Sequence, residues 1–599
     1  MEFLVKIIDF LTPCEKRRAF RILPLIIGLP IVETFAIASV MPVLILLSNS
    51  KIIYSNLKFQ TLFKLSSKLG INTTEDFLIT LGSISFLIIL FSSIYRAFVN
   101  YKINHFIEMT RHSISTRLLE KYLKQPYVFY LSRHSGDLSK MIISEVDEMV
   151  RNVYLPVLNI FLHAMVIIAI FFLVIFLNTF AAFFVIIFLG VIFYLIHYVT
   201  SNGIKKMGEI LVSVNKDRFF IISEVLNGIK PIKLLGVEFE YQSRYSDASL
   251  RQAFTLSKLQ TVKQWPNYLV EVLIFGTVIL ITFGLVFSSG GLSNSSLEHL
   301  FPIIGLNAFS AYRMKPSFYQ IYSGFVSLRY GKALTESINK DWISQTIPLK
   351  TVEQSPKLIQ VKKNISFENV SYTYLNSRDP VLSKINLSIP LGSSIGIVGT
   401  TGAGKTTFVD VFLGLLRPTL GAICVDGKPV GDDEIRAWQR NIGYVPQDIF
   451  LFDATIAENI ALGLPKNRIN YEQVIRCAQI SQVSQFIEND LPNKYDTIVG
   501  EQGVRLSGGQ KQRIGIARAL YQNPDILVFD EATSSLDVIT EQAAIEALRK
   551  INGIKTLILV THRLSTVKNC NQIVHLERGQ IVEISNSLDY SLKYFDTKK

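Results

Sequence analysis

Gly399-Thr400-Thr401-Gly402-Ala403-Gly404-Lys405-Thr406 is the stretch that decides the fold of the second half of this chain. The eight residues follow the pattern G-x-x-x-x-G-K-[ST], which forms a phosphate-binding loop. The apolar run 394–398 before the loop predicts a buried strand, and the residues from Thr407 to Leu413 predict a helix. Such a strand, turn and helix N-terminus bind anions, because free backbone N–H groups and the helix dipole point toward the phosphates. Lys405 would place a positive charge at the β- and γ-phosphates of a nucleotide, and the hydroxyl of Thr406 would bind Mg²⁺.

Composition divides the chain into two parts. Of its 599 residues 49% are hydrophobic, 40 are Phe and only 18% are charged, which is apolar for a soluble protein. The apolar excess lies before residue 325 or so, so we expect a membrane-embedded first half and a soluble second half. The net charge of +13 fits basic loops on the cytoplasmic side better than nucleic-acid binding. The four cysteines have no paired spacing, which argues against disulfides and against a cysteine-based metal site: Cys14, Cys424, Cys477 and Cys570.

Six membrane spans are expected from apolar stretches of about 20 residues or more. They lie near 22–47, 77–100, 153–177, 179–200, 268–289 and 300–325. Lys and Arg are frequent at the N-terminus and in the segments 101–150 and 202–263, so both chain termini are expected in the cytosol. No cleavable signal peptide is expected, because the first apolar stretch is too long. The first domain is therefore predicted as 1–340, a bundle of six helices with two long cytosolic excursions.

The first external loop departs from the charge rule, since it carries Lys58, Lys64 and Lys68. Near 55–69 its apolar residues share one helical face, which predicts an amphipathic helix in the plane of the lipid headgroups. A basic surface loop folded on the bundle is the alternative. Further along, 341–357 is polar and predicts a linker, and 358–599 alternates strands and helices as an α/β nucleotide-binding domain does.

Two acids end an apolar strand at 526–531. Asp530 can hold the Mg²⁺ shell at the carboxyl end of the strand, where ligands gather in open α/β sheets. Glu531, one residue later, is placed to act as a general base on the attacking water. An acidic strand end is common, but about 125 residues after a phosphate-binding loop it predicts the second half of an ATPase site.

The sequence Leu506-Ser507-Gly508-Gly509-Gln510 resembles the signature of ATP-binding-cassette (ABC) proteins, and the resemblance extends over the whole chain. It implies that the signature of one subunit covers the γ-phosphate held by the phosphate-binding loop of another. Tyr374 resembles the aromatic residue that stacks on adenine, and Gln447 the Q-loop residue that contacts Mg²⁺ and the attacking water. Ser535-Leu536-Asp537 is similar to the D-loop, and His562 to the switch histidine that contacts the γ-phosphate.

The same resemblance implies an exporter. The segment 497–503 resembles the cross-linking loop of exporter-type members, and 132–142 and 224–235 resemble the coupling helices that rest on the cassettes. One chain carries one cassette, so a symmetric homodimer that uses ATP and Mg²⁺ is expected. The expected fold is a six-helix membrane bundle of exporter type followed by an α/β P-loop domain.

For the cargo, the layout most resembles bacterial flippases of lipid-linked oligosaccharides, which serve protein glycosylation and polysaccharide assembly. The segments that carry this resemblance are 33–39 with Pro42, 55–69, 227–238 and 311–316. It implies a bacterial inner-membrane protein. Another lipid, a drug or a peptide is the alternative cargo, and an ATP-gated channel or membrane regulator is the alternative from another class.

Arg313 and Lys315 in the sixth span are the candidate substrate residues. A cation inside a span costs about 2.5–3.5 kcal/mol on insertion scales, so it normally faces a polar cavity or a partner. A pyrophosphate has the sign that Arg can grip with two hydrogen bonds, and Arg313 is preferred because the two side chains point apart on a helix. The alternative is that both cations pair with acids such as Glu33 or Glu271, or extend to the inner interface. His163 in the third span is predicted to be a hydrogen-bonded bundle residue rather than a proton relay.

Overall fold

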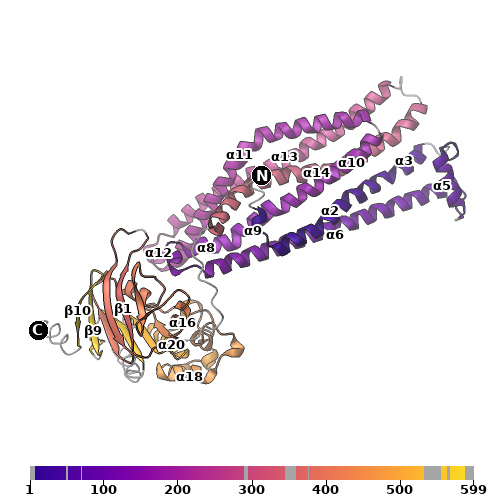
Figure 1. Ribbon diagram of the computed structural model, residues 1–599. Helices are drawn as coiled ribbons and strands as arrows, with labels where there is room; N and C mark the ends of the chain where they lie inside the picture. The colour runs from indigo at the N-terminus through magenta and orange to yellow at the C-terminus, as the bar shows by residue number, and fades with distance from the viewer. Residues whose placement is uncertain are drawn as a thin grey trace. The chain divides into compact units, whose positions relative to one another are not determined.

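The protein, a computed structural model, forms two compact units (Figure 1). The residues that the structure describes are 7–48, 52–68, 70–177, 179–288, 294–343, 359–375, 377–531, 555–562, 567–568 and 570–586. The first unit, called the membrane unit below, comprises 1–124 and 133–345, and the second, the α/β unit, comprises 125–132 and 346–599. Asp537, with the rest of the expected D-loop, and most of the expected linker 341–357 lie outside the described residues.

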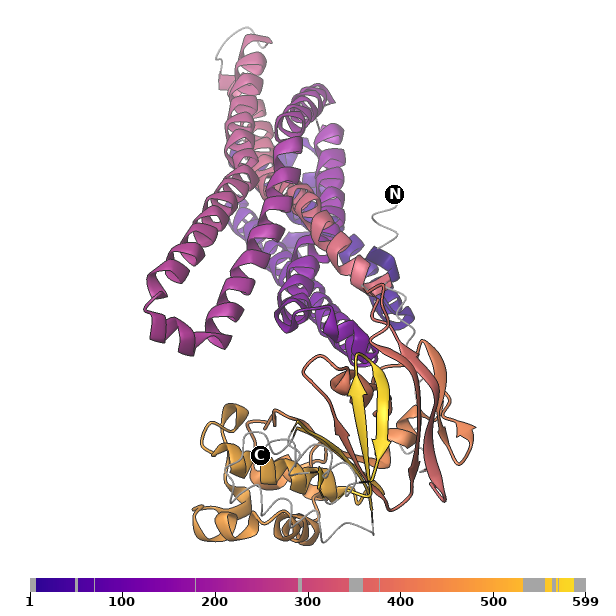
Figure 2. The same ribbon diagram turned by 90° about the vertical axis from the view of Figure 1, so that its left-hand side faces the viewer.

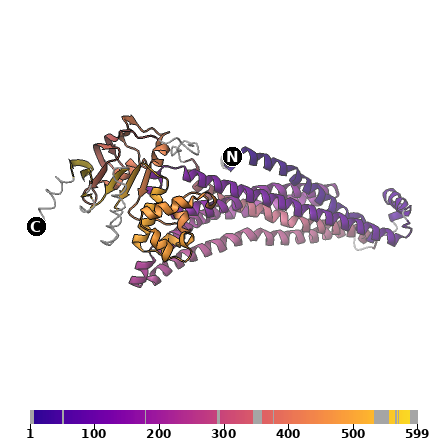
Figure 3. The same cartoon turned by 90° about the horizontal axis from the view of Figure 1, so that it is seen from below.

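The membrane unit is built of long helices that run side by side (Figure 3). They are α2 (Pro13–Ala38), α3 (Val40–Ser48), α6 (Thr74–Leu123), α10 (Leu155–Leu177), α11 (Thr179–Asn227), α13 (Glu238–Ser288) and α14 (Asn294–Ile343). The shorter helices are α4 (Ile52–Ser55), α5 (Leu57–Ser67), α8 (Ser135–Lys140), α9 (Val146–Met149) and α12 (Ile229–Leu235), and π-helical turns at Met141–Glu145 and Val150–Tyr154 flank α9. Within this unit, α3 and α5 lie at one end and α8 and α12 at the other (Figure 1).

Three stretches in the described part are long and apolar enough to cross a membrane: Pro13–Ser48, Thr74–Leu123 and Gly136–Ile175. They contain the first three expected spans. The other three expected spans lie on α11, α13 and α14, where the structure leaves many side chains undescribed. In the first span the helix continues through Pro24 and Pro30 and is interrupted at Ser39, which separates α2 from α3.

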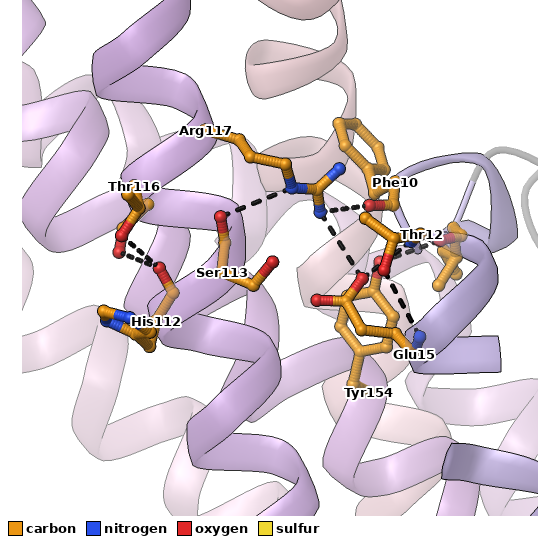
Figure 4. A network of polar contacts seen from close by, with 10 residues as sticks. Phe10, Thr12, Glu15, His112, Ser113, Thr116, Arg117 and Tyr154 are labelled. Carbon is orange, nitrogen blue, oxygen red and sulfur yellow. Dashed lines mark hydrogen bonds and ion pairs between the residues drawn. The ribbon is translucent and has the colours of Figure 1, made fainter. Parts of the chain in front are cut away.

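The start of α2 is tied to two other helical segments (Figure 4). Thr12 and Glu15 cap α2 reciprocally, each side chain bonding to the backbone N–H of the other. The guanidinium of Arg117 on α6 donates to the carbonyl oxygen of Phe10 at 2.6 Å and lies 3.6 Å from Glu15. Tyr154 donates to the carbonyl oxygen of Ile7 at 2.7 Å. These contacts anchor the segment before the first span to the helical bundle.

The expected amphipathic helix is present as α5, and it packs on the bundle. Phe59 and Phe63 contact the apolar cluster around Phe77, while Leu62 and Leu65 are 48% and 60% exposed. The structure thus combines the two interpretations of this loop: a helix forms, one edge of it is folded on the bundle, and its leucines face outward.

The α/β unit contains two sheets. The strands are β1 (Asn364–Tyr372), β2 (Leu382–Pro390), β3 (Ser394–Val398), β4 (Leu420–Val425), β5 (Lys428–Pro429), β6 (Ile442–Val445), β7 (Ile526–Asp530), β8 (Thr556–Val560), β9 (Gln572–Glu577) and β10 (Gln580–Ser585). An antiparallel sheet has the order β2-β1-β4-β5, and a second sheet has the order β10-β9-β3-β8-β7-β6. All neighbours in the second sheet are parallel except β10 and β9.

The helices of the α/β unit are α7 (Tyr127–Leu131), α15 (Lys405–Phe412), α16 (Ile435–Arg440), α17 (Ile456–Ile460), α18 (Tyr471–Ile480), α19 (Ser484–Asn489) and α20 (Gly508–Tyr521). Short 3₁₀ turns lie at Lys466–Arg468, Lys494–Asp496 and Glu501–Gly503.

The helix that follows the phosphate-binding loop, α15, forms part of the main core of the α/β unit. The ring of Phe408 stacks on Phe367 of β1 at 4.5 Å between centroids, and Phe412 meets Trp438 edge to face at 5.4 Å. All four rings are fully buried. This packing fixes the direction of α15, and therefore the position of the loop at its N-terminus.

The first loop between long helices is divided between the two units. The short helix α7 belongs to the α/β unit, and the chain from Arg133 onward, which holds most of the segment 132–142 expected as the first coupling helix, belongs to the membrane unit. Val128 of α7 packs against the core that contains Phe408. The role of 132–142 as a coupling helix stays a prediction. The second excursion is confirmed as helical, since α11 ends at Asn227 and α12 covers Ile229–Leu235; Figure 2 shows α11 and α13 leaning away from the other helices toward this tip.

An acid lies in the same core. Asp410 of α15 is half-buried, and burial together with the neighbouring Asp530 raises its pKa from 3.8 to about 6. A carboxyl whose pKa is raised by folding destabilises the folded state when it is ionised. The cost is absent below about pH 4, appears between about pH 4 and 6 and is complete above pH 6.

Replacing Asp410 by the neutral isostere Asn should therefore stabilise the protein at pH 7.5 but not at pH 4. After allowance for solvent screening we expect about 1–2 kcal/mol. Thermal unfolding of the full-length D410N protein without nucleotide, followed between pH 4.5 and 8, measures the gain. The exposed acid Asp490 provides the control variant D490N, which should show no pH-dependent gain. Equal gains for D410N at both ends of the pH range would contradict the assignment.

Candidate functional site: an ATPase centre at the edge of a parallel sheet

Four candidate segments meet at one edge of the second sheet. The phosphate-binding loop follows β3, Gln447 follows β6, Glu531 follows β7 and His562 follows β8. Because β6, β7, β8 and β3 are parallel, their carboxyl ends lie at the same edge, where α/β sheets bind their ligands.

The phosphate-binding loop has the backbone that its glycines permit. Gly404 precedes α15 with φ +97°, a left-handed conformation that L side chains rarely adopt. At Gly399 an added Cβ would collide with the carbonyl oxygen of Leu576 on β9. The Lys405 side chain is nearly buried, and its ammonium donates to the carbonyl oxygens of Gly399 and Thr400 at 2.9 and 3.2 Å. The sequence-predicted loop is thus formed, with the cation held inside it and Thr406 exposed at its rim.

Glu531 is the centre of the polar contacts. Its carboxylate accepts a hydrogen bond from the Gln447 side chain at 3.1 Å, and it lies 3.6 Å from Nδ1 of His562 and 3.9 Å from Nζ of Lys405. Its backbone has φ +46° and donates to the carbonyl oxygen of Val560 at 2.8 Å. A left-handed non-glycine residue is strained and is typical of functional sites. The structure therefore brings together four residues that the sequence had predicted separately.

Asp530, the residue before Glu531, is buried, with 7% of its surface exposed. Burial, with a smaller contribution from Glu531, raises its pKa, while a hydrogen bond from the hydroxyl of Tyr444 at 3.3 Å opposes the rise. Burial and the nearby Asp530 and Asp410 carboxylates in turn raise the pKa of Tyr444, which keeps it a hydrogen-bond donor. Asp410 and Tyr444 were not found from the sequence. The signal that could have shown them is an acid on the buried face of α15 and a hydroxyl within the apolar strand β6.

The expected adenine-stacking residue, Tyr374, is anchored beside the loop. Its hydroxyl shares a hydrogen bond of 3.2 Å with the Thr407 hydroxyl, and its ring contacts Tyr372 edge to face. These contacts fix the Tyr374 ring close to the phosphate-binding loop, a position that is compatible with stacking on the adenine of a bound nucleotide.

The signature segment forms a helix N-terminus. Ser507 caps α20: its hydroxyl accepts from the Gln510 N–H at 3.3 Å, and Gln510 Oε1 accepts from the Ser507 N–H at 2.8 Å. Ser507 and Gly508 are exposed, and a Cβ on Gly508 would meet nothing within 4 Å. Free N–H groups at an exposed helix N-terminus attract phosphate. Among the described contacts, the hydrogen bonds of Ser507 and Gln510 join these two residues and do not reach the phosphate-binding loop of the same chain.

The residues at the sheet edge fit Mg²⁺ bound together with nucleotide phosphates. The Thr406 hydroxyl, the Asp530 carboxylate and the Gln447 amide oxygen are hard oxygen donors of the kind Mg²⁺ prefers. No cluster of three His, Cys, Asp or Glu side chains suited to a metal occurs in the described residues.

The two candidate substrate cations have different surroundings. The ammonium of Lys315 pairs with Glu271, so one of the expected alternatives holds for it. Arg313 is half-buried over the ring of Phe309, and it pairs with no acid among the described residues. Glu33, one of the two acids considered as partners for these cations, pairs with Arg96 of α6 at 2.6 Å. The sequence reading missed Arg96, because it lies at the end of an expected span, where Arg commonly reaches the interface.

His163 is confirmed as a hydrogen-bonded bundle residue. Its Nδ1 lies 3.1 Å from the hydroxyl of Ser317 on α14. The contact joins two neighbouring helices of the membrane unit.

Two family models match the chain. Residues 382–534 match the model described as ABC transporter, and residues 35–309 match the model for the ABC transporter transmembrane region. In a solved structure of a bacterial Atm1-family ABC exporter with ATP bound, the same fold covers 96% of both chains, with a TM-score of 0.73 and 23% identity.

Curated relatives agree. The heterocyst differentiation ATP-binding protein HepA of a Nostoc species is 31% identical over 84% of this chain and 81% of that protein. YgaD of Bacillus subtilis, named for multidrug export, is 39% identical, but the match spans only 40% of this chain and 41% of the relative, less than two thirds of either. Members of this family hydrolyse ATP, with Mg²⁺ as cofactor, to power transport, and they combine a transmembrane helical domain with the nucleotide-binding domain described above. This chain belongs to the ABC transporter family.

Proposed function

We propose that this protein is an ATP-driven exporter that works as a symmetric homodimer. Its cargo would be a lipid-linked oligosaccharide of the pyrophosphate–polyprenol type, moved from the inner to the outer leaflet of the bacterial inner membrane, with both chain termini in the cytosol. The observation that carries the cargo proposal is the half-buried Arg313, which pairs with no acid among the described residues while the buried Glu33 is bound by Arg96.

Hydrolysis would use Glu531 as the general base. A water placed between the γ-phosphate and Glu531 would give its proton to this carboxylate, which Gln447 orients from one side. Nδ1 of His562 lies 3.6 Å from the same carboxylate oxygen, and His562 would contact the γ-phosphate. Lys405 and the loop N–H groups would hold the phosphates, Tyr374 the adenine, and Asp530 the metal shell. Bound Mg²⁺ would offset charge on the β- and γ-phosphates.

A second copy would complete each site. Ser507 and Gly508 present an exposed helix N-terminus, and among the described residues the hydroxyl and the N–H of Ser507 form capping bonds with Gln510. The tip of the membrane unit also lacks a covering partner in one chain, as Leu234, Leu235 and Phe239 are 84%, 71% and 80% exposed. Such a large apolar surface favours burial in an assembly. The D-loop residue Asp537, which falls outside the described residues, is proposed to lie at the same dimer contact.

The arginine pair supports an anionic cargo. Glu33 is 3% exposed and is bound by Arg96, so its charge is neutralised. Arg313 lies within electrostatic reach of both and adds a further positive charge. A cation within a span is costly, and here the protein supplies two arginines for one acid. The excess positive charge matches a pyrophosphate, which two guanidinium groups can bind with paired hydrogen bonds.

Lys315 is the weaker candidate. Its charge is already balanced by Glu271, so an anionic cargo would have to displace that acid. We therefore assign it a structural role and Arg313 the contact with the cargo.

The exposed leucines of α5 also support a lipid cargo. Phe59 and Phe63 hold this helix on the bundle, which leaves Leu57, Leu62 and Leu65 free to meet acyl or polyprenyl chains. Export of another lipid, or of a drug as in the name of YgaD, is the second candidate, since exposed apolar surface fits these cargoes as well. The excess arginine charge favours the phosphate-bearing lipid. Vectorial movement in vesicles would exclude a channel or a regulator.

Replacing Glu531 by Gln should abolish ATP turnover and leave ATP binding intact. The amide keeps the shape and the contact with Gln447 but cannot accept a proton. Loss of a general base typically lowers the rate by about 10²–10⁴-fold. Phosphate release and binding of a fluorescent ATP analogue by the purified protein test this, with the exposed Glu472→Gln as control. Turnover by E531Q at the wild-type rate would remove Glu531 from the base role.

Composite sites can be tested with mixed dimers. Lys405→Ala removes the cation from the phosphate-binding loop of its own chain, and Ser507→Arg blocks the helix N-terminus that its chain would contribute to the partner's loop. In a dimer of one K405A and one S507R chain, one site carries both lesions and the other neither. We expect each homodimer to be inactive and the verified heterodimer to recover up to about half of the wild-type ATPase activity. Complete inactivity of the heterodimer would argue against independent composite sites.

Arg313→Ala should reduce flipping of a pyrophosphate-linked oligosaccharide in vesicles by tenfold or more, roughly the worth of one charge-assisted hydrogen bond. Basal ATPase activity should persist, because the ATP site is untouched. Arg313→Lys should retain part of the function if charge matters more than bidentate binding. Arg251→Ala, at an exposed position on α13, is the control. Wild-type flipping by a stable R313A protein would end the anion-site proposal, and loss of yield and thermal stability in R313A would indicate a structural role.

A further inference from the structure

The first long helix of the membrane unit, α2, begins with arginines that have no acidic partner. Arg17, Arg18 and Arg21 lie in its first turns and are exposed. Among the described residues, none of the three side chains forms a hydrogen bond or an ion pair. Glu15, the acid in the first turn of α2, is 5% exposed and lies 3.6 Å from Arg117 of α6. The positive charge of the three arginines is therefore not balanced within the described part of the chain.

The opposite side of α2 is held by its neighbours, which fixes the rotation of the helix (Figure 4). Thr12 and Glu15 cap the helix start, where Arg117 also binds. Ile26 and Leu29 lie on the same side as Glu15, three and four turns further along, and are 0% and 1% exposed. Rotation of α2 about its axis would break these contacts, so the arginines on the other side stay directed away from the bundle.

Exposed apolar side chains continue along the arginine side of α2. Phe20, Ile27, Ile31 and Phe35 are 71%, 43%, 53% and 69% exposed, and they are called the apolar track below. With 3.6 residues per turn, all four lie within about 80° of Arg17 around the helix axis. One face of α2 thus carries positive charge at its start and an apolar surface along its length.

The dimensions of this face match one leaflet of a lipid bilayer. From Arg21 to Ile31 the helix rises by about 15 Å, which is half of a hydrocarbon core of about 30 Å. Phe35 lies one turn further along. The apolar track therefore extends from the level of the headgroups to about the middle of the bilayer, as the acyl chain of a phospholipid does.

The arginines belong to the end of the membrane unit that leads to the ATPase site. Arg117, which binds the start of α2, lies shortly before Gln125, where the chain enters the α/β unit. In the proposed orientation this end faces the cytosol, so the arginines lie at the cytoplasmic leaflet. Anionic lipids of that leaflet attract basic side chains close to the surface, and a guanidinium can bind a phosphate with two hydrogen bonds.

We propose that this face of α2 binds an anionic diacyl phospholipid of the cytoplasmic leaflet. Arg17 and Arg21 bind the phosphate, and an acyl chain lies along the apolar track. Arg18 points about 100° away from Arg17 around the helix and is not needed for the same headgroup. The site lies on the outer face of the helix, apart from Arg313, so the inference depends on the proposed orientation and not on the cargo.

Native mass spectrometry of the full-length protein tests this site without nucleotide or cargo. The purified protein in a neutral detergent is titrated with dioleoylphosphatidylglycerol, and separately with the zwitterionic dioleoylphosphatidylcholine. R17Q/R21Q removes both charges, and R17K/R21K retains them. The matched control K216Q/R251Q removes two charges from exposed positions on α11 and α13, which lie outside the proposed site. Thermal unfolding shows whether each variant is folded.

We expect the wild-type protein to bind phosphatidylglycerol more tightly than phosphatidylcholine. R17Q/R21Q should weaken the binding of phosphatidylglycerol by about 25-fold, about fivefold for each charge, and leave that of phosphatidylcholine unchanged. R17K/R21K should keep most of the preference, because the charge contributes more than the paired hydrogen bonds. K216Q/R251Q should bind both lipids as the wild type does. Glycerophosphoglycerol, the same headgroup without acyl chains, should not displace the lipid.

Equal affinities of R17Q/R21Q and K216Q/R251Q for phosphatidylglycerol would overturn the proposal. Displacement by glycerophosphoglycerol would also overturn it, since the site would then bind a soluble phosphate. Dissociation of the dimer in R17Q/R21Q would show that a second copy of the chain covers this face instead. The comparison of the two lipids on the wild-type protein needs no variant, and equal affinities there would exclude the headgroup site even if R17Q/R21Q fails to fold. R313A should retain phosphatidylglycerol as the wild type does, so failure of this site and failure of the proposed cargo site can be told apart.

Discussion

Three carboxylates, Asp410, Asp530 and Glu531, lie at one end of a buried parallel sheet, and the arrangement of the site depends on how their charge is balanced. Like charges in an apolar setting disfavour one another's ionised forms. Two groups offset this repulsion. The Lys405 ammonium lies 3.9 Å from Glu531, and the Tyr444 hydroxyl donates a hydrogen bond to Asp530. This balance holds the acids in place with one lysine and neutral donors. A divalent cation bound together with the nucleotide would offset the remaining negative charge, and Asp530 and Thr406 would help to hold it.

The membrane unit presents the opposite problem. There Glu33 is bound by Arg96, and Arg313 pairs with no acid among the described residues. Lys315 and Glu271 are paired, as are Lys140 and Glu145, whose charged atoms lie 2.7 Å apart with both side chains almost fully buried. Arg313 therefore differs from these two cations in its surroundings.

Much of the ATP site could be predicted from the sequence, because its motifs encode backbone geometry. Gly399 and Gly404 mark positions where the chain must turn or approach another strand. Ser507 and Gln510 together indicate where a helix begins. The carboxyl ends of parallel strands then bring Gln447, Glu531 and His562 together without further information. Partners chosen by tertiary packing could not be predicted in this way. Arg96 binds Glu33, one of the two acids considered as partners for the cations of the sixth span, and residues 125–132 join the α/β unit, because both outcomes depend on distances between elements that no local pattern records.

The membership of α7 in the α/β unit has a consequence for how the chain is connected. Residues 125–132 belong to the α/β unit, although they lie in the sequence between two segments of the membrane unit. The core of the α/β unit is also discontinuous in sequence, since Val128 fills part of it from more than 200 residues away. An α/β domain cut from the chain at residue 358 would lack this piece and expose the apolar surface that Val128 covers. The nucleotide-binding half is thus not a module appended to the membrane half, but a fold that the loop after α6 helps to build.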